Sequence, residues 1–136
     1  MIDRAQILDS IDRGYQARSR GDKEGVAPIW APGATYRLCG EASLVPSFPC
    51  GPAAAGETVD SLIDLISFQS YERLETIVEG NRAAIRWRVD FSIQDGPSGT
   101  TELADFWEFD DEGRATSLIQ FLDTAKLGEM LRASGR

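Results

Sequence analysis

The stretch that decides the fold is residues 84–94, AIRWRVDFSIQ, in which apolar and polar residues alternate. Alternation with a period of two is typical of a β-strand, because successive side chains point to opposite faces of a sheet. One face carries Ile85, Trp87, Val89 and Phe91, and the other face carries Arg86, Arg88, Asp90 and Ser92. The pattern by itself predicts a half-exposed strand whose polar face meets solvent.

The same period extends to both sides of this stretch. The predicted strands span residues 34–39, 71–79, 84–94, 100–109 and 115–122. The connectors between the last four strands are residues 80–81, 95–99 and 110–113. These connectors are rich in Gly, Asp, Asn and Pro, which favour turns. Short turns join antiparallel strands, so residues 71–122 are predicted to form an antiparallel meander.

A helical period appears before and after the meander. Residues 1–20 place Ile7, Leu8, Ile11 and Tyr15 on one helix face. The other predicted helices are a short one capped by Asp22 after a turn at Gly21, one from Thr58 to about Gln69, and a final short one capped by Asp123 or Thr124. Residues 40–56, rich in Pro and Gly, are predicted to form a long loop.

Three helices followed by a long meander predict an α+β fold. We expect the helices to pack on a strongly curved antiparallel sheet and to leave a cone-like pocket between the two layers. A length of 136 residues suits a single domain over residues 1–136.

Composition excludes several classes of function. The chain has 22 acidic and 14 basic residues, a formal net charge of -8 and a pI of about 4.5, which disfavours nucleic acid and anionic membrane surfaces as partners. It contains no histidine, which excludes Ser-His-Asp and Cys-His nucleophile systems and His-containing metal sites. We expect no metal and no cofactor.

The chain shows no signal for a membrane. Its first residues are charged from the third position onward, and no window approaches the ~18–20 apolar residues of a membrane span. We therefore expect a cytoplasmic protein in which Cys39 and Cys50 stay free thiols, because a reducing compartment disfavours disulfides.

Three segments of the sequence, taken in this order, resemble those of a known family. They are ARSRGDKEGVAPIWAPGATYRL at residues 17–38, RWRVDF at 86–91 and DFWEFDDEGRATSLIQFLDT at 105–124. Together they resemble the nuclear transport factor 2-like superfamily, which includes ketosteroid isomerase, the SnoaL-like polyketide cyclases and limonene-1,2-epoxide hydrolase. The resemblance covers nearly the whole chain, and it supports architecture more than activity because these folds carry unrelated functions.

The sequence Arg88-Val89-Asp90 looks like the Arg-x-Asp element of the limonene-epoxide hydrolases. The resemblance implies that Asp90 protonates an epoxide oxygen, that Arg88 bridges it to a second carboxylate, and that Tyr36 positions water. The family's water-binding Asn is replaced here by Leu38, and its second Asp by Gln120, which cannot accept a proton from water. Epoxide hydrolysis by that route is not expected.

Asp105 matches the ketosteroid isomerase Asp that stays protonated in an apolar site and helps to form an oxyanion hole. Burial would raise the pKa of Asp105 in the same way. The alternative is that Asp105 pairs with Arg86 or Arg88 across neighbouring strands. The isomerase's base corresponds to Leu38, and its oxyanion tyrosine aligns one residue before Tyr15, which is therefore a candidate for the pocket.

The resemblance implies a polar wall in the concave pocket, with a small, largely apolar ligand that bears a polar oxygen group. The candidate catalytic residues are Asp90, Asp105 and Arg88, and the candidate ligand contacts are Tyr15, Tyr36, Arg86, Trp107 and Gln120. Two functions remain open: a cofactor-independent isomerase, cyclase or hydrolase that uses carboxylate acid/base chemistry, and a non-catalytic ligand-binding or scaffold protein.

The opposite, convex face of the sheet is expected to be apolar. Its expected exposed residues are Trp87, Val89, Phe91, Phe106, Ile119 and Phe121. A monomer does not readily leave such an area in water, so a homodimer through this face is predicted.

Overall fold

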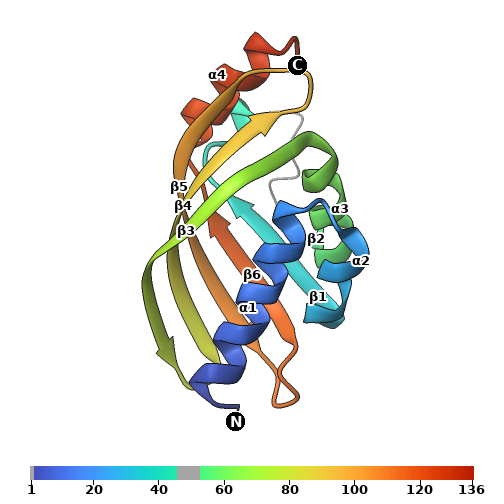
Figure 1. Cartoon of the computed structure of the whole chain (residues 1–136), viewed down its shortest axis with the longest axis vertical. Coiled ribbons are helices and arrows are strands. Elements are labelled where there is room, and N and C mark those ends of the chain that lie inside the picture. The colour runs from blue at the N-terminus through green and yellow to red at the C-terminus, as the bar shows by residue number, and fades with distance from the viewer. Residues whose placement is uncertain (1, 46–52) are drawn as a thin grey trace.

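A computed structural model describes residues 2–45 and 53–136 of the chain. The elements are α1 (Arg4–Ser19), α2 (Lys23–Val26), the 3₁₀ helix η1 (Ala27–Ile29), β1 (Trp30–Cys39), the 3₁₀ helix η2 (Ala42–Leu44), β2 (Ala53–Ala54), α3 (Ala55–Leu65), β3 (Ile66–Glu79), β4 (Arg82–Ile93), β5 (Ser98–Phe109), β6 (Ala115–Phe121) and α4 (Thr124–Ala133). One sheet holds six strands in the order β2-β1-β6-β5-β4-β3 (Figure 1). The α+β fold is confirmed.

The antiparallel meander predicted for residues 71–122 is present. Strands β3 to β6 pair in chain order, and Gly80 and Asn81 make the two-residue turn that sets Glu79 opposite Arg82. β1 adds to the far side of β6 in parallel, and β2 pairs with β1 in antiparallel orientation. The strands of the meander contribute most of the inner surface of the fold.

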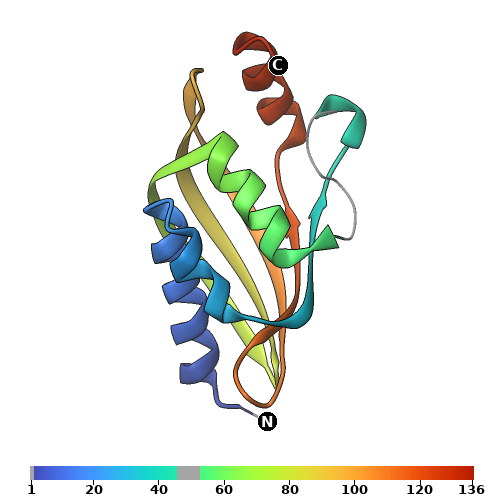
Figure 2. The same ribbon diagram turned by 90° about the vertical axis from the view of Figure 1, so that its right-hand side faces the viewer.

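Curvature of the sheet has a local cause in β3. Its pairing with β4 shifts register twice, between Phe68 and Ser70 and between Arg73 and Glu75. Extra residues of this kind bend a strand and increase its twist. The sheet therefore curls around α1, α2 and α3, which all cover its inner face, while α4 lies at the end of the sheet opposite the N-terminus (Figure 2).

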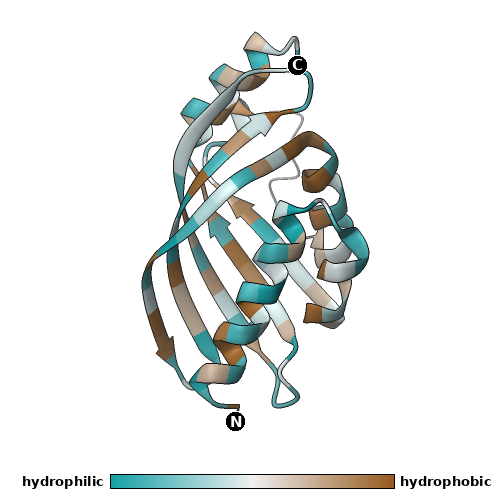
Figure 3. Cartoon of the chain, viewed as in Figure 1, coloured by the Kyte–Doolittle hydropathy of each residue, from teal (hydrophilic) through white to brown (hydrophobic). Residues whose placement is uncertain are grey.

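The core lies between the three helices and the inner face of the sheet. Ile7 and Ile11 of α1 are fully buried, and Trp87 of β4 is only 1% exposed. Figure 3 shows the hydrophobic positions alternating with hydrophilic ones along the strands, as the sequence pattern predicts. Burial of these large side chains, at roughly 1.5–3 kcal/mol each, supplies the main driving force for the layered packing.

The strand β4 faces the opposite way from the expectation based on family resemblance. Ile85, Trp87, Val89 and Phe91 point into the core, so the expectation that the last three lie on the convex outer face is wrong. The cause is the register with β5, which sets Ile85 directly opposite Asp105. Directly opposed residues share a face, so Asp105 lies with the apolar residues of β4, and the simple prediction of a solvated polar face is confirmed.

Several boundaries differ from the expected ones. The helix expected at 58–69 is α3, which ends at Leu65, and residues 66–70 already belong to β3. Thr58 is not its N-cap; its hydroxyl lies within the helix and donates to the Ala54 carbonyl at 3.0 Å. Local periodicity cannot separate a helix end from a strand start in a continuous apolar run, because both contain buried residues.

The other helix signals are confirmed. Asp22 accepts a hydrogen bond from the Gly25 amide at 2.9 Å, and Asp123 accepts one from the Lys126 amide at 3.0 Å. Gly21 has φ of 66°, which other residues rarely adopt. Cys39 is a free thiol. Cys50 and much of the loop expected at 40–56 lie outside the described residues.

In the part of the chain that the structure describes, none of the helices has the length and hydropathy needed to span a bilayer.

The N-terminus of α1 offers a test of how the first helix is fixed. The Asp3 carboxylate accepts from the Gln6 amide at 2.8 Å, and the Gln6 side chain accepts from the Asp3 amide at 3.0 Å. We expect Asp3→Ala to lower the free energy of unfolding by about 1 kcal/mol, and Asp3→Asn, which keeps an acceptor, by much less. Urea denaturation measures both variants. An unchanged free energy of unfolding in Asp3→Ala would show that the cap contributes nothing, and equal losses in both variants would show that the acceptor retained by Asn does not account for the effect.

Candidate functional site

A hydrogen-bond network surrounds the carboxylate of Asp105, which has no exposed surface. One oxygen accepts from the Tyr15 hydroxyl at 2.6 Å and from the Trp87 indole at 3.1 Å. The other oxygen accepts from the Gln120 amide nitrogen at 2.9 Å. The Gln120 amide oxygen accepts in turn from the Tyr36 hydroxyl at 2.7 Å. Four elements of the fold are thereby joined at one buried acid.

The secondary structure sets the positions of these groups. Asp105 of β5 is directly opposite Gln120 of β6, so their side chains share the inner face. Tyr15 comes from the inner side of α1, where its ring stacks on that of Trp87 with 3.9 Å between centroids and 18° between planes. The contact holds the tyrosine hydroxyl at the carboxylate. Tyr36 reaches the same place from β1.

Burial controls the charge of Asp105. Loss of solvent raises its pKa from 3.8 to about 6, although the hydrogen bonds from Tyr15, Gln120 and Trp87 act in the opposite direction. Burial also raises the pKa of Tyr15 and Tyr36 far above the ordinary value of a phenol, so both hydroxyls stay protonated at neutral pH. The group is a carboxylic acid poised to gain or lose a proton near pH 6, held between neutral donors.

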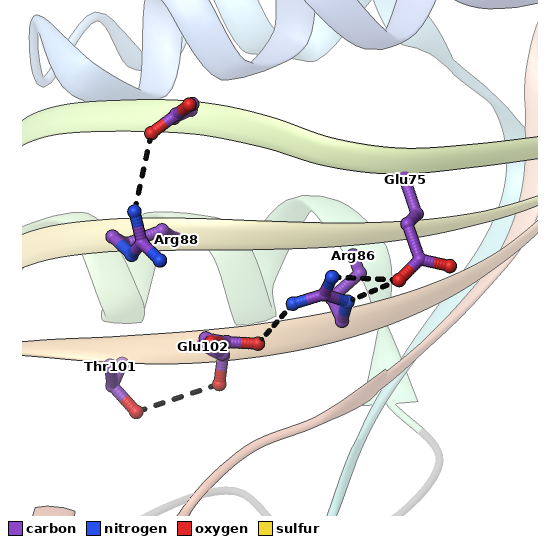
Figure 4. Close-up of polar contacts among 6 residues, drawn as sticks. Glu75, Arg86, Arg88, Thr101 and Glu102 are labelled. Atoms are coloured by element: carbon purple, nitrogen blue, oxygen red, sulfur yellow. Dashed lines mark hydrogen bonds and ion pairs between the residues drawn. The ribbon is translucent and has the colours of Figure 1, made fainter.

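The alternative in which Asp105 pairs with Arg86 or Arg88 is wrong. Arg86 lies on the outer face, where its guanidinium bonds Glu75 at 2.7 Å and Glu102 at 2.5 Å, and Arg88 approaches Glu72 at 3.5 Å (Figure 4). Successive side chains of a strand point to opposite faces of the sheet, so a residue next to an inward-facing one points to solvent. The expectation that Arg86 and Arg88 line the pocket is therefore also wrong.

Asp90 is likewise on the solvent side of β4, away from the core. Its carboxylate accepts from the hydroxyls of Ser70 at 2.6 Å and Thr100 at 2.5 Å, and these bonds lower its pKa. The expectation that Asp90 and Asp105 work in one pocket is wrong because they point to opposite faces of the sheet. The Arg-x-Asp pattern of residues 88–90 here serves the outer surface.

Two neighbouring cavities open inside the fold, beside the network. The centres of water-sized spheres can occupy about 60 Å³ of the larger cavity and about 40 Å³ of the smaller one. A single water needs roughly 10–15 Å³ by this measure, so both can hold several waters or part of a small ligand. Both cavities are lined by Arg18, Tyr36, Leu62, Phe68 and Gln120.

The two cavities differ in their remaining walls. The larger is mostly apolar, with Leu38 in its wall, and is bordered at α4 by Asp123 and Lys126. The smaller is lined by Tyr15 and Trp107. The indole N–H of Trp107 makes no hydrogen bond of good geometry within the described residues, although its proximity helps to lower the pKa of Asp105. Asp105 itself lies behind Tyr15 and Gln120 and does not line either cavity.

The structure thus brings together four of the predicted residues, Tyr15, Tyr36, Asp105 and Gln120, and places Trp107 beside them. Sequence reasoning missed Arg18, which lines both cavities. Its signal was its spacing, because Arg18 follows Tyr15 by three residues and Ile11 by seven, on the inward side of α1. A basic residue near the end of a helix is ordinarily exposed, so the type of residue pointed the other way.

Several solved structures have a fold similar to that of this chain. A protein of unknown function from Burkholderia pseudomallei K96243, described as NTF2-like, is 21% identical, with a TM-score of 0.78 over 94% of this chain and 98% of the other. A proposed isomerase from Rhodopseudomonas palustris is 24% identical, with a TM-score of 0.72 over 93% and 97%. An epoxide hydrolase of M. tuberculosis, described as LEH-like, is 14% identical, with a TM-score of 0.70 over 95% and 92%.

These similarities, at low identity, show that the fold is the nuclear transport factor 2-like fold. The model of the SnoaL-like domain matches residues 11–118, and the chain belongs to that family. Among curated proteins, none matches the chain significantly. The resemblance on which the sequence analysis relied is therefore confirmed for family and fold.

The raised pKa of Asp105 predicts how stability depends on pH. The folded protein binds this proton more tightly than the unfolded chain, so the contribution to stability is complete below about pH 4 and is lost as pH rises through about 6. The loss is at most ~3 kcal/mol. We expect Asp105→Asn to remove this dependence and to be level with, or more stable than, the parent protein at about pH 8.

Denaturant unfolding from about pH 4.5 to about pH 8 measures the difference between parent and variant. Asp90→Asn is the matched control, because the pKa of Asp90 is lowered and its contribution is lost only below this range. A difference between parent and Asp105→Asn that does not change with pH would contradict the expectation.

Proposed function

We propose that this protein binds a small, largely apolar molecule bearing a polar oxygen group in the two cavities beside the Asp105 network. The observation that carries the proposal is an apolar interior space whose walls include three buried polar side chains, Tyr15, Tyr36 and Gln120. A concave apolar pocket with a few convergent polar groups is the usual form of a small-molecule site.

Binding without chemistry is the function favoured first. Leu38 and Gln120 stand at the two positions where related enzymes carry the groups that activate water or abstract a proton, and neither side chain can act as a base. Among the described residues that line the larger cavity, the single carboxylate is Asp123, and it is occupied as the N-cap of α4.

A second candidate is a cofactor-independent isomerase, cyclase or hydrolase, and Asp105 favours it. Asp105 is buried without a cation, and it bonds Tyr15, whose side chain borders the smaller cavity. A neutral acid and a tyrosine of this kind can stabilise negative charge that develops on a substrate oxygen. In this interpretation Tyr15 contacts the substrate, and Asp105 positions the Tyr15 hydroxyl.

Protonation of Asp105 would change what the network offers to a ligand. When Asp105 is ionised, the hydroxyls of Tyr15 and Tyr36 both donate hydrogen bonds to acceptors within the network. A protonated Asp105 must itself donate, either to Tyr15 or to a Gln120 amide that has turned over. Either change displaces one tyrosine proton from its acceptor, and that hydroxyl can then donate to an oxygen in a cavity.

Binding of cyclohexanone tests this proposal. We expect the affinity of the parent protein to increase as pH falls through about 6, because the freed hydroxyl donates to the ketone oxygen. Asp105→Asn, whose amide donates like the neutral acid, should bind without that pH dependence. Tyr36→Phe should bind about 3- to 10-fold more weakly, the loss of one hydrogen bond. Ligand-observed NMR titration measures each affinity.

Asp90→Asn is the control, because it changes a carboxylate on the outer face and should titrate like the parent. Absence of binding at millimolar cyclohexanone would contradict the pocket proposal, and binding that is independent of both pH and Tyr36 would contradict the role of the network.

We also propose that the outer face of the sheet pairs with a second copy of the chain. Its apolar patch consists of Ile77, Phe106, Ile119 and Phe121, which border an open hollow. Ile77 is 64% exposed, Phe106 50% and Phe121 48%. Exposed apolar side chains gathered in one patch favour association, and a two-fold dimer covers the same patch on both copies.

Sedimentation velocity at micromolar concentrations tests the dimer. We expect the parent chain to sediment as a dimer and Phe106→Glu to sediment as a monomer, because a charge cannot be buried unpaired at the contact. Arg88→Gln, on the same sheet face but outside the patch, should remain dimeric. A monomeric parent chain would overturn the proposal.

A further inference from the structure

Arg18 is the one cationic side chain of α1 that lines the interior cavities. It borders both of them, together with Tyr36, Phe68 and Gln120. One of its terminal nitrogens donates to the carbonyl of Leu62 at 3.2 Å, and its guanidinium carbon lies 4.1 Å from the centroid of the Phe68 ring. These contacts fix the guanidinium against the cavity wall.

This arginine has no carboxylate partner within residues 2–45 and 53–136. Arginines of the outer surface do: Arg86 pairs with Glu75 and Glu102, and Arg73 pairs with Asp12. The buried acid nearest in the network, Asp105, takes its hydrogen bonds from Tyr15, Trp87 and Gln120 instead. The N–H groups of Arg18 beyond the one given to Leu62 have no hydrogen-bond partner in the described part of the chain.

An unpaired cation in an apolar cavity is costly to fold. Burial lowers the pKa of Arg18 to about 10, which leaves the side chain charged at neutral pH. The guanidinium stacks on an aromatic ring, which compensates only part of the lost hydration. A protein gains from such an arrangement when a ligand supplies the missing anion, since a planar guanidinium binds a carboxylate through two parallel hydrogen bonds.

We propose that the ligand of this cavity is a small apolar carboxylate, whose anionic group is bound by Arg18 while its hydrocarbon part packs on the apolar wall. The inference rests on the proposed function of the cavity as a small-molecule site. The apolar wall against which the hydrocarbon part packs consists of Leu38, Leu62, Val89, Phe91 and Leu103.

The charges at the cavity agree with an anion. Its described lining holds two cations, Arg18 and Lys126, and one carboxylate, Asp123, in a chain whose net charge is -8. Lys126 lies at α4, where its ammonium donates to the Thr100 carbonyl. The lining therefore has one more cation than carboxylates although the molecule as a whole is negative, which selects an anion by local contacts rather than by long-range attraction.

Two matched pairs of probes test the proposal at about pH 8: benzoate with benzamide, and octanoate with octanamide, measured by titration calorimetry. Each pair has the same shape and differs by one charge. We expect the parent protein to bind the acids at least about 10-fold more tightly than the amides. Arg18→Gln should weaken binding of the acids by about 10- to 100-fold and leave the amides unchanged.

The Arg18→Gln chain is expected to fold, because removal of an unpaired, half-buried charge relieves desolvation, and thermal unfolding of each variant checks this. Arg18→Lys keeps the charge but not the planar pair of donors, and should restore only part of the affinity. Arg88→Gln removes a positive charge from the outer face and is expected to bind the acids as the parent does.

The outcomes separate the two proposals. Equal affinity for acid and amide, unchanged in Arg18→Gln, would overturn the anion inference while leaving a small-molecule cavity. Loss of acid binding in Lys126→Gln, with unchanged acid binding in Arg18→Gln, would also overturn the anion inference. Absence of binding by all four probes at millimolar concentration, in protein that also fails to bind cyclohexanone, would overturn the cavity proposal itself.

Discussion

The buried carboxylate of Asp105 loses its hydration, and hydrogen bonds from the protein have to replace it. The inner structure depends on the donors of these bonds. An acid without exposed surface needs donors, and these come from α1, β4 and β6 as Tyr15, Trp87 and Gln120. The packing of the first helix on the sheet is therefore tied to a polar contact as well as to apolar burial. Replacement of Gln120 leaves one buried oxygen without a donor, and replacement of Tyr15 or Trp87 removes one of the two donors to the other oxygen, which is why such networks specify one arrangement of a core.

Charge is divided between the two faces of the sheet. The outer face satisfies Arg86 and Arg88 with glutamates from neighbouring strands, where solvent keeps each ion pair inexpensive and of small net value. Among the residues that the structure describes, the inner face holds an acid without a cation and, in the cavity lining with Tyr36 and Gln120, a cation without an acid. Separation of this kind is unfavourable for folding alone, and residues that oppose stability are concentrated where proteins bind or transform ligands.

Membership of the SnoaL-like family fixes the scaffold and leaves its chemistry open. This chain has the helices, the curved sheet and two internal cavities, and Leu38 lines the larger of the two.

The sequence by itself determined the elements: period-two alternation predicted the meander and helical spacing predicted α1 and α4. Asp22 and Asp123 marked the starts of α2 and α4, and Gly21 marked the turn after α1, because these signals depend on contacts a few residues apart. It also identified Asp105 as an acid among apolar neighbours on its strand. The tertiary structure alone decided which face of β4 is buried and that Arg18, near the end of α1, lines the cavities. Alternation is the same for either face, so the sequence could not decide that Arg86, Arg88 and Asp90 face solvent while Ile85 lies beside Asp105 on the buried face.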